Sequence, residues 1–459
     1  MQNDLTKRIT LLITTVASFL TPFDVSSVNV ALPSIGKEFS MDAISLSWVA
    51  TAYLLASAMF LVPFGRVADI HGRKRIFIIG ILTFTVASFS MILSKSAMML
   101  ICFRIFQGIG AAMIFGTGVA LLTSVFPPQE RGRALGISVA AVYFGLSIGP
   151  FLGGFLTLHF GWRSIFLVNV PLGLTLVALV SLKLEGEWAE SKGEKFDLIG
   201  SIIYCFGLIA IMYGFSSFSQ LHTILSAALV LSGIVGIFAF MKWETKVRNP
   251  ILDISLFRNN RVFAFSNIAA LINYSATFAV TFFLSLYLQY VRKLDPQSAG
   301  LILVFQPIVM AIGSPFAGRL SDRTEPRIIA STGMVLTAVG LFLLAFLHGN
   351  TALEFIIGDL VLLGLGFALF SSPNTNAVMS SVEKRSYGVA SATLGTMRLT
   401  GQMFSMGITV LILAIHIGHA QITSENYPLF LTSARSAFIF FAGLCSGGVF
   451  ASLTRGKVR

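Results

Sequence analysis

The chain has 459 residues, of which 55% are hydrophobic and only 11% are charged, and it contains 42 phenylalanines. This composition excludes an ordinary soluble domain and is typical of a polytopic membrane protein. The net charge of +12 does not indicate nucleic-acid binding, because the basic residues are spread over loops that separate apolar runs. The three cysteines, Cys102, Cys205 and Cys445, lie within apolar runs and have no disulfide or metal-ligand spacing.

Apolar runs close to the length of about 20 residues that crosses a bilayer recur fourteen times along the chain. They predict an all-α polytopic membrane protein with fourteen transmembrane helices. The predicted spans cover residues 9–32, 46–64, 76–94, 98–122, 134–157, 164–182, 198–216, 221–241, 262–290, 297–317, 328–348, 352–376, 387–415 and 431–453. The first run is too long for a signal-peptide core and carries Asp24, so we expect it to remain in the protein as a helix.

The basic residues alternate between the two sides of the predicted membrane. Most lie in loops on the side of the N-terminus: Lys7, Arg8, Arg66, Arg73, Lys74, Arg75, Arg131, Arg133, Lys183, Lys192, Lys195, Lys242, Lys246, Arg248, Arg258, Arg261, Arg319, Arg323, Arg327, Lys384, Arg385, Arg455, Lys457 and Arg459. The other side holds few: Lys37, Lys95, Arg163, Arg292, Lys293 and Arg435. The positive-inside rule therefore predicts a multi-pass protein of the plasma membrane with both termini in the cytoplasm.

An internal repeat divides the chain. The stretch GRVADIHGRK from Gly65 matches GRLSDRTEPR from Gly318, and ERGRALG from Glu130 matches EKRSYGV from Glu383 at the same separation. Spans 1 to 6 then correspond to spans 9 to 14, which predicts a six-helix bundle over residues 1–195, two inserted helices over 196–245 and a second six-helix bundle over 246–459. Parallel halves of this kind occur in secondary transporters, where the substrate site lies between them. We expect the two inserted helices to face lipid rather than the substrate path.

Four sequence motifs, in addition to this architecture, indicate a resemblance to a known family. They are DVSSVNVALP from Asp24, GRVADIHGRK from Gly65, RIFQGIGAA from Arg104 and GLSIGPFLGG from Gly145. With them the chain resembles, over nearly its whole length, the major facilitator superfamily and, within it, the drug:proton antiporters with fourteen helices. The resemblance implies a gating loop after the second span, with Gly65, Asp69, Gly72, Arg73 and Lys74 in the motif's places. Ile70 departs from the motif, which usually has an arginine there.

Four ionisable residues fall within the spans, where a charge is costly and therefore a functional candidate. They are Asp24, Arg104, Asp359 and Arg398, and we expect them to serve proton coupling. Asp24 lies about 22 Å from the inner end of its helix and Arg104 about 9 Å from the outer end, so in a core of about 30 Å their depths agree. The alternative for Asp24 is a permanent ion pair with Arg104 that only fixes helix contacts, and which of Asp24 and Asp359 titrates stays open.

Two glutamines are candidates for the substrate cavity: Gln107, one turn from Arg104, and Gln306, beside Pro307. In the gating loop we expect Asp69 to form a charge-assisted hydrogen bond, to an arginine or to helix-end amides, with Arg131 close by. This bond would hold the inner side closed. The alternative is a solvated loop whose cations only set the topology.

The stretch GLSIGPFLGG places glycines four residues apart within the fifth span. Gly145, Gly149 and Gly153 share one helix face, with Pro150 and Gly154 beside it. Small residues let two membrane helices approach closely, and the proline lets the helix bend. We expect this face to form an outer seal against the tenth span. The alternative is a static packing seam between two helices.

Together these features predict a proton-coupled secondary transporter that exports apolar or cationic drug-like compounds by alternating access. One alternative is a symporter or facilitator of the same fold for a metabolite, and another is a membrane sensor or assembly protein that does not transport. We expect no enzymatic activity, no cofactor and no metal, with the proton gradient as the energy source. The expected partners are small hydrophobic or cationic substrates, protons and membrane lipid, without nucleic acid, and the expected state is a monomer.

Overall fold

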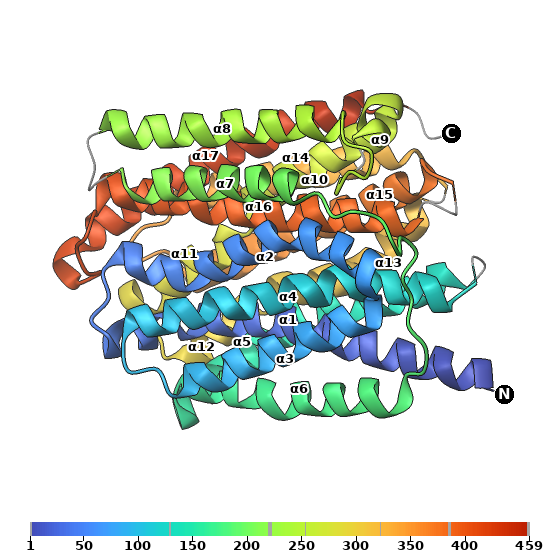
Figure 1. Ribbon diagram of the computed structural model, residues 1–459. Coiled ribbons are helices and arrows are strands. Elements are labelled where there is room, and N and C mark those ends of the chain that lie inside the picture. Colours follow the sequence, from blue (N-terminus) through green and yellow to red (C-terminus); the bar gives the residue numbers. More distant parts are fainter. Residues whose placement is uncertain are drawn as a thin grey trace.

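The computed structural model describes residues 2–127, 130–218, 223–252, 254–321, 323–383 and 387–456, with the side chains of all of these except residues 2–5 and 255. Four of the cations that the charge pattern assigns to the cytoplasm lie outside the described residues: Lys384, Arg385, Lys457 and Arg459. The helices run side by side in one bundle, and both termini lie at the same end of it (Figure 1). We call this end the terminal end and the opposite one the far end.

Helices form the regular structure of the described residues, and fourteen helical stretches among them are long and apolar enough to cross a membrane. The elements are α1 (Gln2–Glu38), α2 (Ala43–His71), α3 (Arg73–Ile92), α4 (Ala97–Val125), α5 (Arg131–Phe160), α6 (Arg163–Lys183), α7 (Leu198–Ser216), α8 (Thr223–Glu244), α9 (Ser255–Asn259), α10 (Arg261–Thr277), α11 (Ala279–Leu286), η1 (Tyr287–Val291), α12 (Pro296–Leu303), α13 (Phe305–Ser321), α14 (Pro326–Leu344), α15 (Leu353–Ser380), α16 (Tyr387–His416), η3 (Ser424–Asn426) and α17 (Tyr427–Thr454). The predicted all-α membrane fold is confirmed.

Local sequence explains where several helices begin and break. The Asp42 side chain accepts a hydrogen bond from the Ser45 N–H at 2.6 Å and so caps α2, and Asp295 caps α12 in the same way. The tenth predicted span is divided into α12 and α13 around Val304. Pro307 lies one turn beyond this break, where it has no N–H to donate and its ring crowds the preceding turn.

The helices pack in two groups, and the pair α7 and α8 contacts both groups through α7. In the first group α1 packs on α5, α2 and α3 pack on α4, and α3 packs on α6; in the second α10 packs on α16, α13 and α14 pack on α15, and α14 packs on α17. Helix α7 contacts both α2 and α16, while α8 packs on α7 at the edge of the bundle (Figure 1). The division of the chain at residues 195 and 245 stays a prediction.

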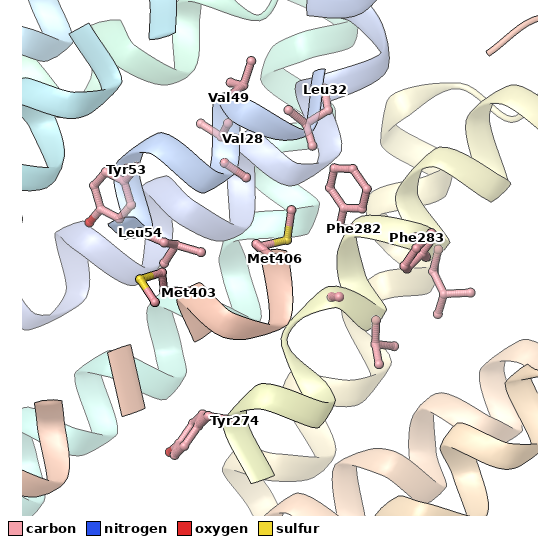
Figure 2. Close-up of a cluster of buried hydrophobic side chains, with 14 of the residues drawn as sticks. Val28, Leu32, Val49, Tyr53, Leu54, Tyr274, Phe282, Phe283, Met403 and Met406 are labelled. Carbon is pink, nitrogen blue, oxygen red and sulfur yellow. The ribbon is translucent and has the colours of Figure 1, made fainter. Parts of the chain in front are cut away.

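Buried apolar side chains join the two groups. Figure 2 shows members of this cluster, among them Leu54 of α2, Met403 of α16 and Phe282 of α11. All three are less than 2% exposed. Since the cluster includes side chains from both groups, they share one apolar core toward the far end.

The glycine face of α5 packs against α1, and not against the tenth span as we expected. A Cβ atom added to Gly145 would lie 2.6 Å from the Phe19 carbonyl oxygen, and one added to Gly153 would lie 2.6 Å from the Ser27 Cα atom. Ser27 also donates a hydrogen bond to the Gly149 carbonyl oxygen at 2.9 Å. The small residues therefore bring two helices of the same group into backbone contact, which is the packing-seam alternative.

Two other residues of the motif, Pro150 and Gly154, touch the tenth span. A Cβ atom on Gly154 would collide with the Pro296 carbonyl oxygen, and one on Gly300 would collide with the carbonyl oxygen of Pro150. These contacts join α5 to α12. The expected seal between the fifth and tenth spans thus depends on Pro150 and Gly154, and its gating role stays a prediction.

We predict that Gly153→Ala lowers the stability of the protein by about 1–3 kcal/mol, because an added methyl group cannot fit against the α1 backbone without moving it. Thermal unfolding in detergent, followed by tryptophan fluorescence, measures the effect. Gly136→Ala, in the same helix, is the matched control, since a Cβ atom there meets nothing within 4 Å. Equal melting temperatures for the two variants would contradict the close α1–α5 contact.

Candidate functional site

A cavity of about 460 Å³ lies between the two helix groups. Its walls come from α1, α2, α4 and α5 on one side and from α10, α15 and α16 on the other. It extends from Tyr53 and Tyr274, deep in the bundle, to Asp69 and Arg131 at the terminal end. The cavity therefore reaches the surface on the side of the termini.

Hydrogen bonds between the groups close the far end. Ser285 donates to the Asn29 carbonyl oxygen at 2.7 Å, and Gln289 donates to the Val30 carbonyl oxygen at 2.8 Å. Both donors come from the ninth span and both acceptors from α1. The two helix groups thus meet beyond the cavity and separate it from the far end.

A second far-end contact joins Asp42, before α2, to His419, after α16, with the His419 Nδ1 atom 2.7 Å from the Asp42 carboxylate. Partial burial acts to raise the pKa of Asp42, but the Ser45 N–H and the His419 ring outweigh it and hold the pKa below its usual value. The carboxylate thus joins the start of α2 to the segment after α16.

A charged cluster lies inside the first helix group beside the cavity. The Arg104 Nη1 atom is 2.6 Å from Asp24 Oδ2, and the Asn169 and Gln107 amides donate to Asp24 Oδ1 at 2.7 and 3.0 Å. All four side chains are at most 1% exposed. Arg104 also donates through Nε to the Val49 carbonyl oxygen at 3.0 Å. The structure thus brings Asp24 and Arg104 together, as their equal depths predict.

Two members of this site are missed by the sequence reasoning. Asn169 lies in an apolar stretch of α6, and a buried amide there, which must find polar partners, is the signal that points to it. Tyr53 places its ring 4.4 Å from the Arg104 guanidinium and also lines the cavity. Tyr53 therefore lies between the buried ion pair and the space open to the terminal end.

The two glutamines expected in the cavity are elsewhere. Gln107 accepts a hydrogen bond from Arg104 and donates to Asp24 and Ser88, so its amide is used within the cluster. Gln306 is buried in α13 and is not part of the cavity lining. Neither side chain is placed to contact a substrate in this state.

Asp359 and Arg398, the other two intramembrane charges, are not brought together. Asp359 is 3% exposed in α15, close to Gly340 of α14, and neither carboxylate oxygen has a hydrogen-bond partner among the described residues. It does not line the cavity. Arg398 does, with its guanidinium 5.4 Å from the centre of the Tyr274 ring.

The loop after α2 forms a compact network at the terminal end. Gly72 has φ +115°, a conformation that favours glycine, and it places Arg73 at the start of α3. Arg73 pairs with Asp69 at 2.8 Å and with Glu190 at 2.7 Å. Asp69 therefore has the arginine partner that we expected, but the partner is Arg73, whereas Arg131 donates to the Phe126 carbonyl oxygen at 2.9 Å.

The connector after α6 completes this network. The Arg73 N–H donates to the Trp188 carbonyl oxygen at 2.8 Å, and the Ser191 N–H donates to the Asp69 carbonyl oxygen at 2.9 Å. Lys74 donates through Nζ to the Leu184 carbonyl oxygen. Gly65 lies at the cavity wall one turn before Asp69. The loop and the connector are thus one unit at the mouth of the cavity.

Two helix groups around a central cavity that is open at one end define a secondary transporter. The model of the Major Facilitator Superfamily matches residues 14–406 and 263–456, and the chain belongs to this family. It is 32% identical to the riboflavin transporter RibZ of Clostridioides difficile, over 85% of each chain, and 33% identical to the cephamycin export protein CmcT of Amycolatopsis lactamdurans, over 87% of this chain and 83% of that one.

One further relative agrees with the family assignment, and one solved structure has a similar fold. The chain is 32% identical to the multidrug resistance protein Stp of Mycobacterium tuberculosis, over 89% of this chain and 76% of that one. Its fold is similar to the crystal structure of a bacterial homologue of the human lysosomal transporter Spinster, in an inward-facing and unoccupied conformation. That comparison has a TM-score of 0.65 and 16% identity, and it covers 98% of this chain and 97% of the other.

We predict a strong energetic coupling between Asp24 and Arg104. Asp24→Asn or Arg104→Gln alone leaves one buried charge without its partner, which costs about 3–5 kcal/mol. The double variant leaves two neutral amides and should recover most of that loss. Melting temperatures of the four proteins in one detergent measure the coupling, and additive losses would show that the pair does not stabilise the helix contacts.

Proposed function

We propose that this transporter exports drug-like small molecules across the plasma membrane in exchange for protons, with its termini in the cytoplasm. The observation that carries the proposal is the buried Asp24 carboxylate, held beside a cavity that reaches the terminal end. An intramembrane acid of this kind usually marks an ion or proton path. The positions of the basic loops support a cytoplasmic terminal end.

In the proposed cycle, Asp24 takes up and releases the proton. Its oxygens accept hydrogen bonds from Arg104, Gln107 and Asn169. Protonation removes the charge that Arg104 pairs with. Because Arg104 also bonds to the α2 backbone and stacks on Tyr53, a change at Asp24 would be transmitted to the cavity wall.

The names of the relatives support transport of small molecules and leave transport of a metabolite as the main alternative. Names such as multidrug resistance protein and cephamycin export protein favour export. The riboflavin transporter favours a second candidate, the transport of a metabolite. Gradient-driven efflux of a dye against uptake of riboflavin in the same vesicles separates the two.

We expect Asp24→Asn to abolish transport driven by a pH gradient in proteoliposomes, because an amide cannot carry the exchanged proton. Exchange of labelled for unlabelled substrate without a gradient should persist. Asp359→Asn is the matched variant, since Asp359 is also buried in the membrane but lies away from the cavity, and it should keep gradient-driven transport. Wild-type coupling in Asp24→Asn would refute the role of Asp24. If only Asp359→Asn loses coupling, Asp359 is the residue that carries the proton.

We propose that the loop network is the inner gate and that it meets the second helix group when the terminal end closes. Asp69→Asn removes a charge-assisted bond to Arg73 that contributes about 1.5 kcal/mol, so transport should slow about tenfold. Because this bond is already formed with the terminal end open, its loss would act by loosening the loop that meets the second helix group. Spin labels at positions 133 and 389, both exposed at the terminal end, should then report more of the open state.

Glu130→Gln is the control for the inner gate, because Glu130 is an exposed carboxylate at the same end that pairs with Lys7 and does not line the cavity. Its transport rate and its distance distribution should match the wild type. If Asp69→Asn also matches the wild type in both measurements, the loop is not a gate.

A further inference from the structure

The charged side chains that line the cavity are unevenly distributed along its depth. They are Arg66, Asp69, Arg73, Arg131, Glu190 and Arg398. The two acids, Asp69 and Glu190, are both at the terminal end and both pair with Arg73. Arg398 is the charged side chain that lines the cavity deeper in the bundle, about 16 Å along α16 from Tyr387 at 1.5 Å per residue.

Among the described residues, Arg398 differs from Arg104 in forming no ion pair with an acid. Arg104 is surrounded by Asp24, Gln107 and the Val49 carbonyl oxygen, and it is 1% exposed. Within the described residues no carboxylate forms an ion pair with Arg398, which is partly exposed to the cavity and stacks on Tyr274. An arginine at this depth costs about 2.5–3.5 kcal/mol on insertion scales, so an uncompensated one is a candidate for binding a ligand.

The surroundings of Arg398 are suited to an aromatic ligand. Tyr274 and Phe278 line the cavity from the second helix group, and Tyr143 reaches it from α5. The Tyr143 hydroxyl forms a hydrogen bond of 2.6 Å with the Ser371 hydroxyl, which joins the two helix groups at the cavity wall. Flat apolar surfaces with a few converging polar groups are typical of small-molecule sites, and aromatic rings prefer such neighbours.

A second donor lies on the same face of α16. Gln402 follows Arg398 by one helical turn and also lines the cavity, so its amide and the guanidinium are directed into the same space. A guanidinium binds a carboxylate through two parallel hydrogen bonds. The site thus offers the planar recognition that a carboxylate or an acidic hydroxyl requires.

We infer that the cavity binds aromatic compounds with an anionic group, which pairs with Arg398. The inference deepens the proposed function, because it depends on this cavity being the substrate site. It replaces the expected cationic substrates, since Asp24 is 0% exposed and engaged with Arg104. A cation in the cavity would meet the like charge of Arg398 in a medium of low dielectric constant without an acid at that depth.

The test compares two xanthene dyes of opposite charge, anionic fluorescein and cationic rhodamine 6G. Their binding to the purified full chain in phosphatidylcholine nanodiscs is followed by fluorescence polarisation without any pH gradient. The wild type should bind fluorescein about tenfold more tightly than rhodamine 6G, as expected for a hydrogen-bonded charge pair. A lack of saturable fluorescein binding, or tighter binding of rhodamine 6G, would overturn the inference.

Arg398→Gln should weaken fluorescein binding at least about tenfold and leave rhodamine 6G unchanged or bound more tightly. Arg435→Gln, an exposed arginine of α17 outside the cavity lining, is the control and should bind both dyes like the wild type. Equal loss in both variants, or no loss in Arg398→Gln, would overturn the inference. If Arg398→Gln does not stay monodisperse, Arg398→Lys is tested instead. It should bind fluorescein more weakly because a lysine cannot form two parallel hydrogen bonds to a carboxylate. Unchanged fluorescein binding in Arg398→Lys would overturn the inference.

Dye transport in proteoliposomes separates this inference from the proposed function. Binding of fluorescein through Arg398 without movement under an imposed pH gradient would refute export and leave the substrate class standing. Gradient-driven export of rhodamine 6G that fluorescein does not inhibit would confirm export and overturn the substrate class.

Discussion

A charge within the hydrocarbon region is costly unless it has a partner inside the protein, and the pairing of Asp24 with Arg104 organises the first helix group. Asp24, Arg104, Gln107 and Asn169 come from α1, α4 and α6, and their hydrogen bonds join three helices that are distant in sequence. Desolvation of the two charges opposes this arrangement by several kcal/mol per ion. The surrounding donors offset that cost, so the cluster persists only while the helices stay in these positions.

The two helix groups use their intramembrane charges differently, although an internal repeat relates their sequences. In the first group the acid and the arginine pair, and Tyr53 separates them from the cavity. In the second group Asp359 faces α14 and Arg398 faces the cavity, without contact between them. The repeat therefore preserves the helix arrangement but not the chemistry. In the function proposed here, the first group exchanges the proton and the second holds the ligand.

Glycines show how far a sequence pattern can be taken in a membrane protein. The four-residue spacing of Gly145, Gly149 and Gly153 predicts close backbone contact on one helix face, and that contact exists. The pattern does not identify the helix on the other side, because Ser26 and Ser27 of α1 offer as small a surface as the tenth span does. The tertiary structure shows that the glycine face packs on α1, whereas Gly154 and Pro150 contact α12.

The sequence by itself determined the number of membrane-crossing helices, the internal repeat and the equal depth of Asp24 and Arg104, because helix rise and bilayer thickness convert residue counts directly into length and depth. It did not determine the direction in which a side chain points around its helix axis relative to its neighbours. Tertiary packing decided that Gln107 joins the charged cluster, that Asn169 and Tyr53 complete it, and that Arg398 faces the cavity whereas Asp359 does not. The position of each of these side chains depends on the rotation of its helix about its own axis and on the neighbouring helices. Only the assembled bundle specifies both.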